Sequence, residues 1–152
     1  MSINKADSLD GKANEHNGFR TMYATAAVTA GNFVAINVTD TENGRGYSVR
    51  HSTVTGLEEG AICGVATETL TAAGYVRVQT RGKYVNANLT TGVLAGELLI
   101  ASSSAGRAIE SNTLSGNTNT DYDYLVIGMA LENEASNVGD VMLFDPFNLA
   151  QS

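Results

Sequence analysis

The side chains that most often carry out catalysis are few and scattered in this sequence. The histidines are His16 and His51, and the only cysteine, Cys63, lies in the apolar run AICGVA at residues 61–66. No neighbouring base or positive charge would lower the pKa of its thiol, so we interpret Cys63 as a small buried hydrophobic residue. The sequence contains no H-E-x-x-H, paired-cysteine or G-x-S-x-G motif, whose spacings are fixed by geometry. We therefore expect no enzymatic activity and no cofactor.

One polar stretch has the spacing of a cation site. In NTNTDYDY, residues 117–124, oxygen ligands stand at every second position: Asn117, Asn119, Asp121 and Asp123. A calcium loop of the EF-hand type also needs glycine at its sixth position and glutamate at its twelfth. Tyr122 and Gly128 stand at those positions. We interpret the stretch as a polar loop and expect no metal site.

Residues 74–89, GYVRVQTRGKYVNANL, form a strand-like segment that is interrupted once. Val76 and Val78 alternate with Arg77, Gln79 and Arg81 in the period-two pattern of a half-buried strand. Glycine at position 82 interrupts this pattern, which then resumes without a turn long enough to reverse the chain. The interruption predicts a bulge or corner at which the strand crosses from one sheet to another.

The same segment concentrates positive charge in an otherwise acidic chain. The predicted bend would gather Arg77, Arg81 and Lys83 on one exposed edge facing an acidic neighbour. That neighbour could be a partner protein or an adjacent subunit, whose residues Glu58 and Glu59 are available. The alternative is that the three are ordinary solvated charges, because surface ion pairs are typically worth about 0–1 kcal/mol.

Composition bounds the size of the protein and its classes of partner. The chain has 152 residues, which suits one domain, and 9 Lys and Arg against 16 Asp and Glu give a net charge of −7. A nucleic-acid backbone requires positive charge clustered over a whole face, so we expect no nucleic-acid partner. No apolar run approaches the roughly 18 residues of a membrane span, and the N-terminal sequence lacks the hydrophobic segment of a secretory signal. We expect no membrane partner.

Two regions are expected along the chain. Residues 1–20 carry three basic and three acidic residues and show no helical or strand period. They could not bury enough surface to offset the entropy of ordering them, so we interpret them as an extended N-terminal arm, disordered when free or extended along a partner. Residues 21–152 are expected to form a single β-barrel domain. With the arm's apolar anchors, the candidate partner-binding residues are Ile3, Leu9, Phe19, Arg20, Arg77, Arg81 and Lys83.

From residue 21 onward the sequence predicts an all-β domain. Sixteen glycines, one proline and 16% charged residues favour strands joined by tight polar turns, and no segment has a helical stripe. Asn43-Gly44 is a strong hairpin signal. The candidate strands are residues 21–28, 32–38, 46–52, 61–68, 75–80, 83–89, 97–102, 107–110, 124–132 and 140–145.

The chain contains an internal repeat with an offset of 64 or 65 residues. GVATETLTAAGYVRV from Gly64 aligns with GMALENEASNVGDVML from Gly128, with one inserted residue in the second copy. Upstream, TAGNFVAI around Gly31 matches LAGELLIA around Gly96. One duplication, with pseudo-repeats at about 28–80 and 93–145, is the simplest origin for a pseudo-symmetric small barrel, although a shared turn pattern could mimic it. The second copy has no counterpart of the basic cluster.

Taken in order, these motifs resemble one family of viral proteins. The set runs TAGNFVAINV, AICGVATE, GYVRVQTRGKY, TTGVLAGELLIAS with GRAIE, and VIGMALE with GDVMLF. It is similar to the small β-rich decoration, or cement, proteins of tailed-phage capsids, over about residues 28–145. The resemblance implies a compact β-barrel or β-tulip, often a homotrimer, that binds the major capsid protein and catalyses nothing.

The resemblance also implies a location. Such a protein is made in the host cytoplasm and sits on the outer capsid surface of the virion, where its arm would run over neighbouring capsid subunits. The alternative is a β-barrel binding module of a virion that recognises host carbohydrate. A module of that kind would expose clustered aromatics beside amides, whereas the tyrosines are dispersed along this sequence: Tyr23, Tyr47, Tyr75, Tyr84, Tyr122 and Tyr124. Tyr122 and Tyr124, with Asn117 and Asn119, are a minor candidate for such a cluster.

Overall fold

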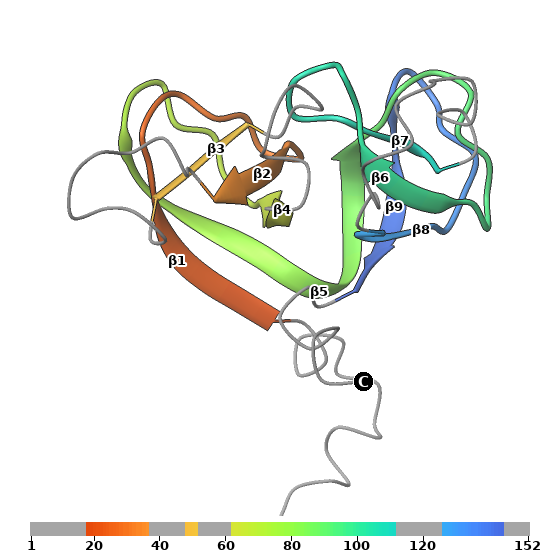
Figure 1. Cartoon of the computed structure of the whole chain (residues 1–152), viewed down its shortest axis with the longest axis horizontal. Helices are drawn as coiled ribbons and strands as arrows, with labels where there is room; N and C mark the ends of the chain where they lie inside the picture. The colour runs from red at the N-terminus through yellow and green to blue at the C-terminus, as the bar shows by residue number, and fades with distance from the viewer. Residues whose placement is uncertain (1–17, 37–47, 52–61, 112–125, 145–152) are drawn as a thin grey trace, which may run out of the picture.

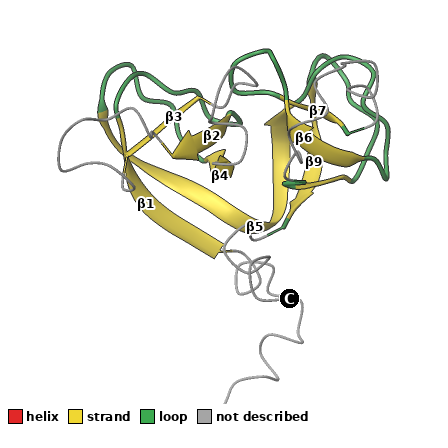
Figure 2. Cartoon of the chain, viewed as in Figure 1, coloured by secondary structure: helices red, strands yellow, loops and turns green. Residues whose placement is uncertain are grey.

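The computed structural model describes residues 18–36, 48–51, 62–111 and 126–144. These residues form nine strands and no helix (Figures 1 and 2). The predicted all-β class is therefore confirmed. The strands are β1 (Gly18–Ala24), β2 (Phe33–Ile36), β3 (Ser48–His51), β4 (Ile62–Ala66), β5 (Gly74–Asn88), β6 (Leu98–Ala101), β7 (Ala108–Glu110), β8 (Gly128–Ala130) and β9 (Val138–Leu143).

The pattern of apolar residues explains which strands lie inside. In β9, buried residues alternate with half-buried ones, as expected of a strand with one face on a core. All five residues of β4 are buried, and so are the first three of β2. Strands that are apolar throughout are typical of a sheet covered on both faces. β2 and β4 are therefore the innermost strands.

β5 is the strand around which the molecule is organised. The hydrogen-bonded order is β1-β3-β2-β4-β5-β9-β8-β6-β7, with an additional pairing of β1 and β5. The pairings β1–β3, β3–β2, β2–β4, β4–β5 and β5–β1 therefore return to their starting strand. On the other side, β5 continues through β9, β8 and β6 to β7, and a bridge between Leu89 and Ala108 returns from β7 to the end of β5.

The two strands predicted at residues 75–80 and 83–89 are one continuous strand with a bend. Gly82 has a φ of +85°, in the left-handed region that glycine adopts without steric penalty. Before the bend, Gly74 to Arg81 pair with β1, and two of these residues also pair with β4; from Gly82 onward β5 pairs with β9. Figure 1 shows the change of direction. The predicted corner at Gly82 is confirmed, but it joins the segments within a single strand.

The order of strands occurs twice. In the first half, β2–β5, the spatial order is β3-β2-β4-β5, and in the second half, β6–β9, it is β7-β6-β8-β9. Every pairing within the two halves is antiparallel. The halves therefore follow one plan, and the second is joined to the first through β5 and β9.

The turns of the two halves also match. The Gly31 N–H donates to the Ala66 carbonyl over 2.9 Å, and the Gly96 N–H donates to the Ala130 carbonyl over 2.8 Å. Gly31 and Gly96 have φ of +87° and +88°. The same turn therefore precedes the first strand of each half.

A glutamate makes the equivalent hydrogen bond in each half. Glu68 Oε1 accepts the N–H of Arg77, and Glu132 Oε1 accepts the N–H of Asp140, each over 3.0 Å. Each carboxylate thus satisfies a backbone donor of the following strand, which would otherwise need a water or another partner.

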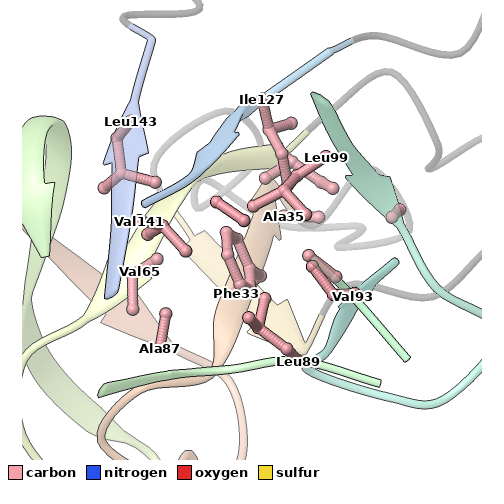
Figure 3. Packing of buried hydrophobic residues seen from close by; sticks show 14 residues of the cluster. Phe33, Ala35, Val65, Ala87, Leu89, Val93, Leu99, Ile127, Val141 and Leu143 are labelled. Atoms are coloured by element: carbon pink, nitrogen blue, oxygen red, sulfur yellow. The ribbon is translucent and has the colours of Figure 1, made fainter. Parts of the chain in front are cut away.

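One hydrophobic cluster spans both halves. Figure 3 shows Phe33 of β2 at its centre. Around this ring lie residues from both halves and from the turns: Ala35, Ile62, Val65, Ala87, Leu89, Val93, Leu99, Ala101, Ala108, Ile127, Ala130, Val141 and Leu143. A second cluster lies among β1 to β5: Met22, Ala24, Val28, Val34, Val49, Cys63, Ala66, Val76 and Val78. Because β2 and β4 contribute to both clusters, they form the wall between them.

The structure moves the boundary of the predicted arm. β1 begins at Gly18 and pairs with β5 along its whole length, so Gly18–Arg20 belong to the sheet. The sequence of these residues shows no strand period. Their pairing partners lie more than 50 residues away, so local pattern did not identify them as part of a strand. Ile3 and Leu9 lie outside the described residues, as does the Asn43-Gly44 hairpin signal.

Candidate interaction surface

The outward side of β1 and the first part of β5 forms a surface of aromatic and basic side chains. The register places Tyr23 opposite Tyr75, Thr21 opposite Arg77 and Phe19 opposite Gln79. The alternate residues of these strands, such as Met22, Val76 and Val78, are buried in the core. Because side chains on a strand alternate between faces, the first set points outward. The β1–β5 face is defined as Phe19, Thr21, Tyr23, Tyr75 and Arg77.

Two pairwise contacts organise this face. The rings of Tyr23 and Tyr75 lie edge to face, with centroids 5.4 Å apart. Tyr75 is 73% exposed and Tyr23 is 41% exposed, so most of the pair is available to a partner. Arg77 Cζ lies 4.0 Å from the centroid of the Phe19 ring, a cation–π contact that holds the guanidinium over the sheet.

The tyrosines are less dispersed in space than in sequence. Tyr23 and Tyr75 meet only because β1 pairs with β5, and reading each segment alone could not reveal this register. Tyr84 is half-buried, and its hydroxyl donates to the Ala66 carbonyl over 2.9 Å. Tyr47, Tyr122 and Tyr124 lie outside the described residues.

The predicted basic residues are divided by the bend. Arg77 belongs to the β1–β5 face, and Arg81 is exposed at the end of the first part of β5, opposite Gly18. Arg20 is exposed on β1. Lys83 lies beyond the bend, where its Nζ forms an ion pair with Asp140 Oδ2 of β9 over 2.7 Å. Glu58 and Glu59, the acidic partners considered for this cluster, lie outside the described residues.

The ion pair of Lys83 joins β5 of the first half to β9 of the second half. The hydrogen bond to Asp140 raises the pKa of Lys83, and the same bond lowers the pKa of the Asp140 carboxyl. The second oxygen of this carboxylate, Oδ1, accepts the N–H of Asn86 over 3.2 Å. Asn86 has a φ of +60° and lies within the register shift between Tyr84 and Ala87. Asp140 therefore holds Lys83 and the irregular part of β5 at once.

A residue that the sequence pattern did not single out supports the bend itself. Gln79 shares the outward parity of Arg77, yet it is only 4% exposed. Its Nε2 donates to the carbonyls of Arg81 and Lys83, over 3.0 Å and 2.8 Å. The amide thus spans Gly82 and bonds a carbonyl on each side of the bend. The one available signal was an amide side chain at an outward-facing position three residues before Gly82.

Cys63 is buried, as the sequence predicted. It is 1% exposed, and its Sγ lies 3.5 Å from the Val34 carbonyl oxygen. Burial raises the pKa of this thiol to about 12. The thiol therefore stays protonated at neutral pH, which suits a packing role.

Several sequence features lie outside these sites. Among the described residues, no three His, Cys, Asp or Glu side chains gather closely enough to hold a metal ion. The stretch at 117–124 and His16 are not described, and His51 ends β3. No helix in the described part of the chain is long and apolar enough to span a membrane.

Comparison with known proteins gives a likeness of fold. No protein family and no curated protein matches the sequence. Among solved structures, the chain is similar to the N base of head fiber gp8.5 in bacteriophage phi29, with a TM-score of 0.54 and 15% sequence identity. The match covers 85% of this chain and 95% of that chain. At this identity the likeness establishes a shared fold over nearly the whole of both chains.

Proposed function

We propose that this chain is a structural protein of a tailed-phage head, a decoration (cement) protein that binds the outer surface of the major capsid shell and stabilises it. The observation that carries the proposal is the fold shared with the base of a phage head fiber over 85% of this chain. The ordered motifs of residues 28–145, which resemble those of phage decoration proteins, support the same role independently of the fold. The protein acts by binding, without catalysis or a cofactor.

The β1–β5 face is the proposed contact with the major capsid protein. Tyrosine and arginine are enriched at the energetically dominant positions of protein interfaces. Here Tyr75 is 73% exposed, and Arg77 is held over the Phe19 ring. A partner that covers them would therefore gain apolar and charged contacts while ordering few side chains. In a chain of net charge −7, Arg77 and the neighbouring Arg81 also direct an acidic partner to this side.

The finer features of the proposal concern shape and assembly. The returning strand pairings on both sides of β5 support a description as a barrel-like domain, because closed pairings leave few open edges. Such a domain contacts its partners through faces, loops and termini. We further propose that the protein forms a homotrimer on the shell, with Ile3 and Leu9 of residues 1–17 as additional capsid anchors.

Co-sedimentation with expanded, undecorated phage shells tests the proposal. The wild-type protein should pellet with the shells in a saturable, salt-sensitive manner. The double variant Tyr75→Ser with Arg77→Glu should bind at least about tenfold more weakly, as expected on losing interface anchors. Leu94→Thr is the matched control, because Leu94 is 52% exposed but lies in the turn before β6. Wild-type protein that stays in the supernatant at low salt would contradict a capsid role.

The exposed tyrosine pair favours one second candidate, a module that recognises host carbohydrate. Sugars bind aromatic side chains through their apolar ring faces, and Tyr23 and Tyr75 present such surfaces beside the hydroxyl of Thr21. Binding of the purified protein to host surface polysaccharide, lost in Tyr75→Ala, together with no binding to shells, would favour this candidate over the first.

A further inference from the structure

A polar hollow lies on the second half of the molecule, and none of its lining residues belongs to the β1–β5 face. Its volume is about 350 Å³, and it is lined by Thr90, Thr91, Ser104, Arg107 and Asn137. Small-molecule sites commonly have volumes of about 300–1,000 Å³. Most such sites are largely apolar, whereas every residue that lines this hollow has a polar side chain. A ligand for this polar hollow must therefore be polar itself.

The walls of the polar hollow are held in place by the backbone. Its residues come from three connections: β5 to β6, β6 to β7, and β8 to β9. Three backbone hydrogen bonds fix these connections: Thr90 N–H to the Ala108 carbonyl (2.9 Å), Leu89 N–H to the Asn137 carbonyl (2.9 Å), and Arg107 N–H to the Ser104 carbonyl (3.1 Å). A ligand would meet a prearranged surface, which lowers the entropy cost of binding.

Arg107 supplies the charge of the polar hollow. Among the described residues that line it, Arg107 is the only charged one. Its Nη1 donates to the Leu89 carbonyl over 2.7 Å, which anchors one nitrogen of the guanidinium. A guanidinium has five N–H donors in a planar fork that matches the two oxygens of a carboxylate. The N–H donors of Arg107 that Leu89 does not use are suited to binding a carboxylate.

The other lining residues suit hydroxyl groups. The Thr91 hydroxyl donates to Asn137 Oδ1 over 2.8 Å, which orients the amide so that Asn137 Nδ2 remains a donor. The Ser104 hydroxyl can donate and accept. The Thr90 hydroxyl is buried and has no hydrogen-bond partner among the described residues, which is unusual in folded proteins.

The first half shows that the shared scaffold does not require two of these polar side chains. In the alignment of the two copies, Thr91 stands where the first copy has Ala26. Asn137 lies where the second copy carries its inserted residue, and Ser136 and Asn137 have φ of +56° and +65°. The corresponding turn of the first copy contains Ala72 and Ala73. The side chains of Thr91 and Asn137 are therefore additions to the second half, whereas Thr90 has a counterpart in Thr25.

We infer that the polar hollow binds a small hydroxylated carboxylate, such as an acidic sugar. The Arg107 fork binds the carboxylate, and the threonine, serine and asparagine side chains bind the hydroxyls. A neutral sugar would leave the guanidinium unmatched, and an apolar ligand would find no apolar wall. The Glu134 carboxylate accepts the N–H groups of Gly92 and Asn137, over 3.2 Å and 2.9 Å, so its oxygens hold the turn.

Titration of the full chain, followed by ¹⁵N–¹H NMR, tests this inference without any capsid. Glucuronate is the probe, and glucose and inorganic phosphate are the comparisons at matched ionic strength. Glucuronate should cause saturable shifts at the amides of the lining residues, with at least about tenfold weaker binding of glucose. Absence of saturable shifts with glucuronate would overturn the inference. Binding of phosphate or of glucose as strong as that of glucuronate would also overturn it, since the hollow would then recognise charge alone or hydroxyl groups alone.

Two variants examine the roles of the side chains. Arg107→Lys keeps the charge but removes the fork, and it should weaken glucuronate binding about tenfold. Thr91→Ala installs the residue of the first copy and should weaken binding several-fold, with a native spectrum showing that the fold is intact. Leu94→Thr, also a first-copy residue but outside the lining, is the control and should bind as the wild type does. Unchanged affinity in both Arg107→Lys and Thr91→Ala would place the ligand elsewhere.

Discussion

The two halves of the molecule share a backbone plan but differ in what they expose. Each has the strand order of β3-β2-β4-β5, the same glycine turn before its first strand, and a glutamate that accepts an N–H of its last strand. The first half gains β1 and with it the β1–β5 face. The second half gains the polar hollow. Tyr75, Arg77, Thr91 and Asn137 of these two surfaces have no counterpart of the same type in the other copy.

The halves also differ in how they are packed. The core around Phe33 takes residues from both halves, whereas the second cluster takes none from β6 to β9. β2 and β4 serve both clusters, so the first half supports the second. We therefore expect the halves to unfold together, despite their similar plans.

Truncation of the ring at the centre of the shared core should have the largest effect. Phe33 is fully buried, and Phe33→Ala should lower the free energy of unfolding by about 3–5 kcal/mol. Urea unfolding followed by circular dichroism gives the value, with exposed Tyr75→Ala as a control that should change it by less than about 0.5 kcal/mol. A wild-type protein with two separate transitions would contradict the joint unfolding of the halves.

Removal of the amide that spans the bend should have the next largest effect. Gln79→Met keeps the length of the side chain but leaves the carbonyls of Arg81 and Lys83 without their donor. A hydrogen bond contributes about 0.5–1.5 kcal/mol net, so loss of the two should cost about 1–3 kcal/mol, which the same urea experiment should show. A loss below about 0.5 kcal/mol would mean that water replaces the amide and that the bend does not depend on Gln79.

The bend also depends on the conformation of glycine. Gly82→Ala places a side chain at a φ of +85°, which costs about 1–2 kcal/mol. Gly74→Ala is the matched control in the same strand, because an added Cβ there would meet only Leu70, at an ordinary 3.7 Å. The control should be neutral or slightly stabilising. Equal destabilisation by both variants would argue against a special role for Gly82.

The smallest effect concerns the ion pair between Lys83 of β5 and Asp140 of β9, which joins the two halves. Lys83→Met should return the pKa of Asp140 toward its ordinary value of about 3.9, as NMR titration of the carboxyl would show. The lowered pKa of Asp140 implies stabilisation that is present above pH about 3.9 and lost as pH falls through the folded-state value. For Lys83, whose pKa is raised, the contribution is lost as pH rises through its folded-state value. Arg81→Met is the control and should leave the Asp140 titration unchanged.

The sequence predicted the parts of the fold that depend on local pattern. Alternation identified most strands, glycine at position 82 marked the corner, and the apolar surroundings of Cys63 predicted its burial. The β1–β5 register, the Lys83–Asp140 pair and the polar hollow join residues that are distant in sequence. Such contacts are fixed by how the strands and turns come together, so no local period records them.

Electron cryomicroscopy of expanded shells saturated with the protein tests the central claim most directly. We expect added density on the outside of the shell that fits this fold, with the β1–β5 face against the major capsid protein and the polar hollow facing solvent. Shells without added density, or density in which the β1–β5 face points away from the shell, would contradict the claim.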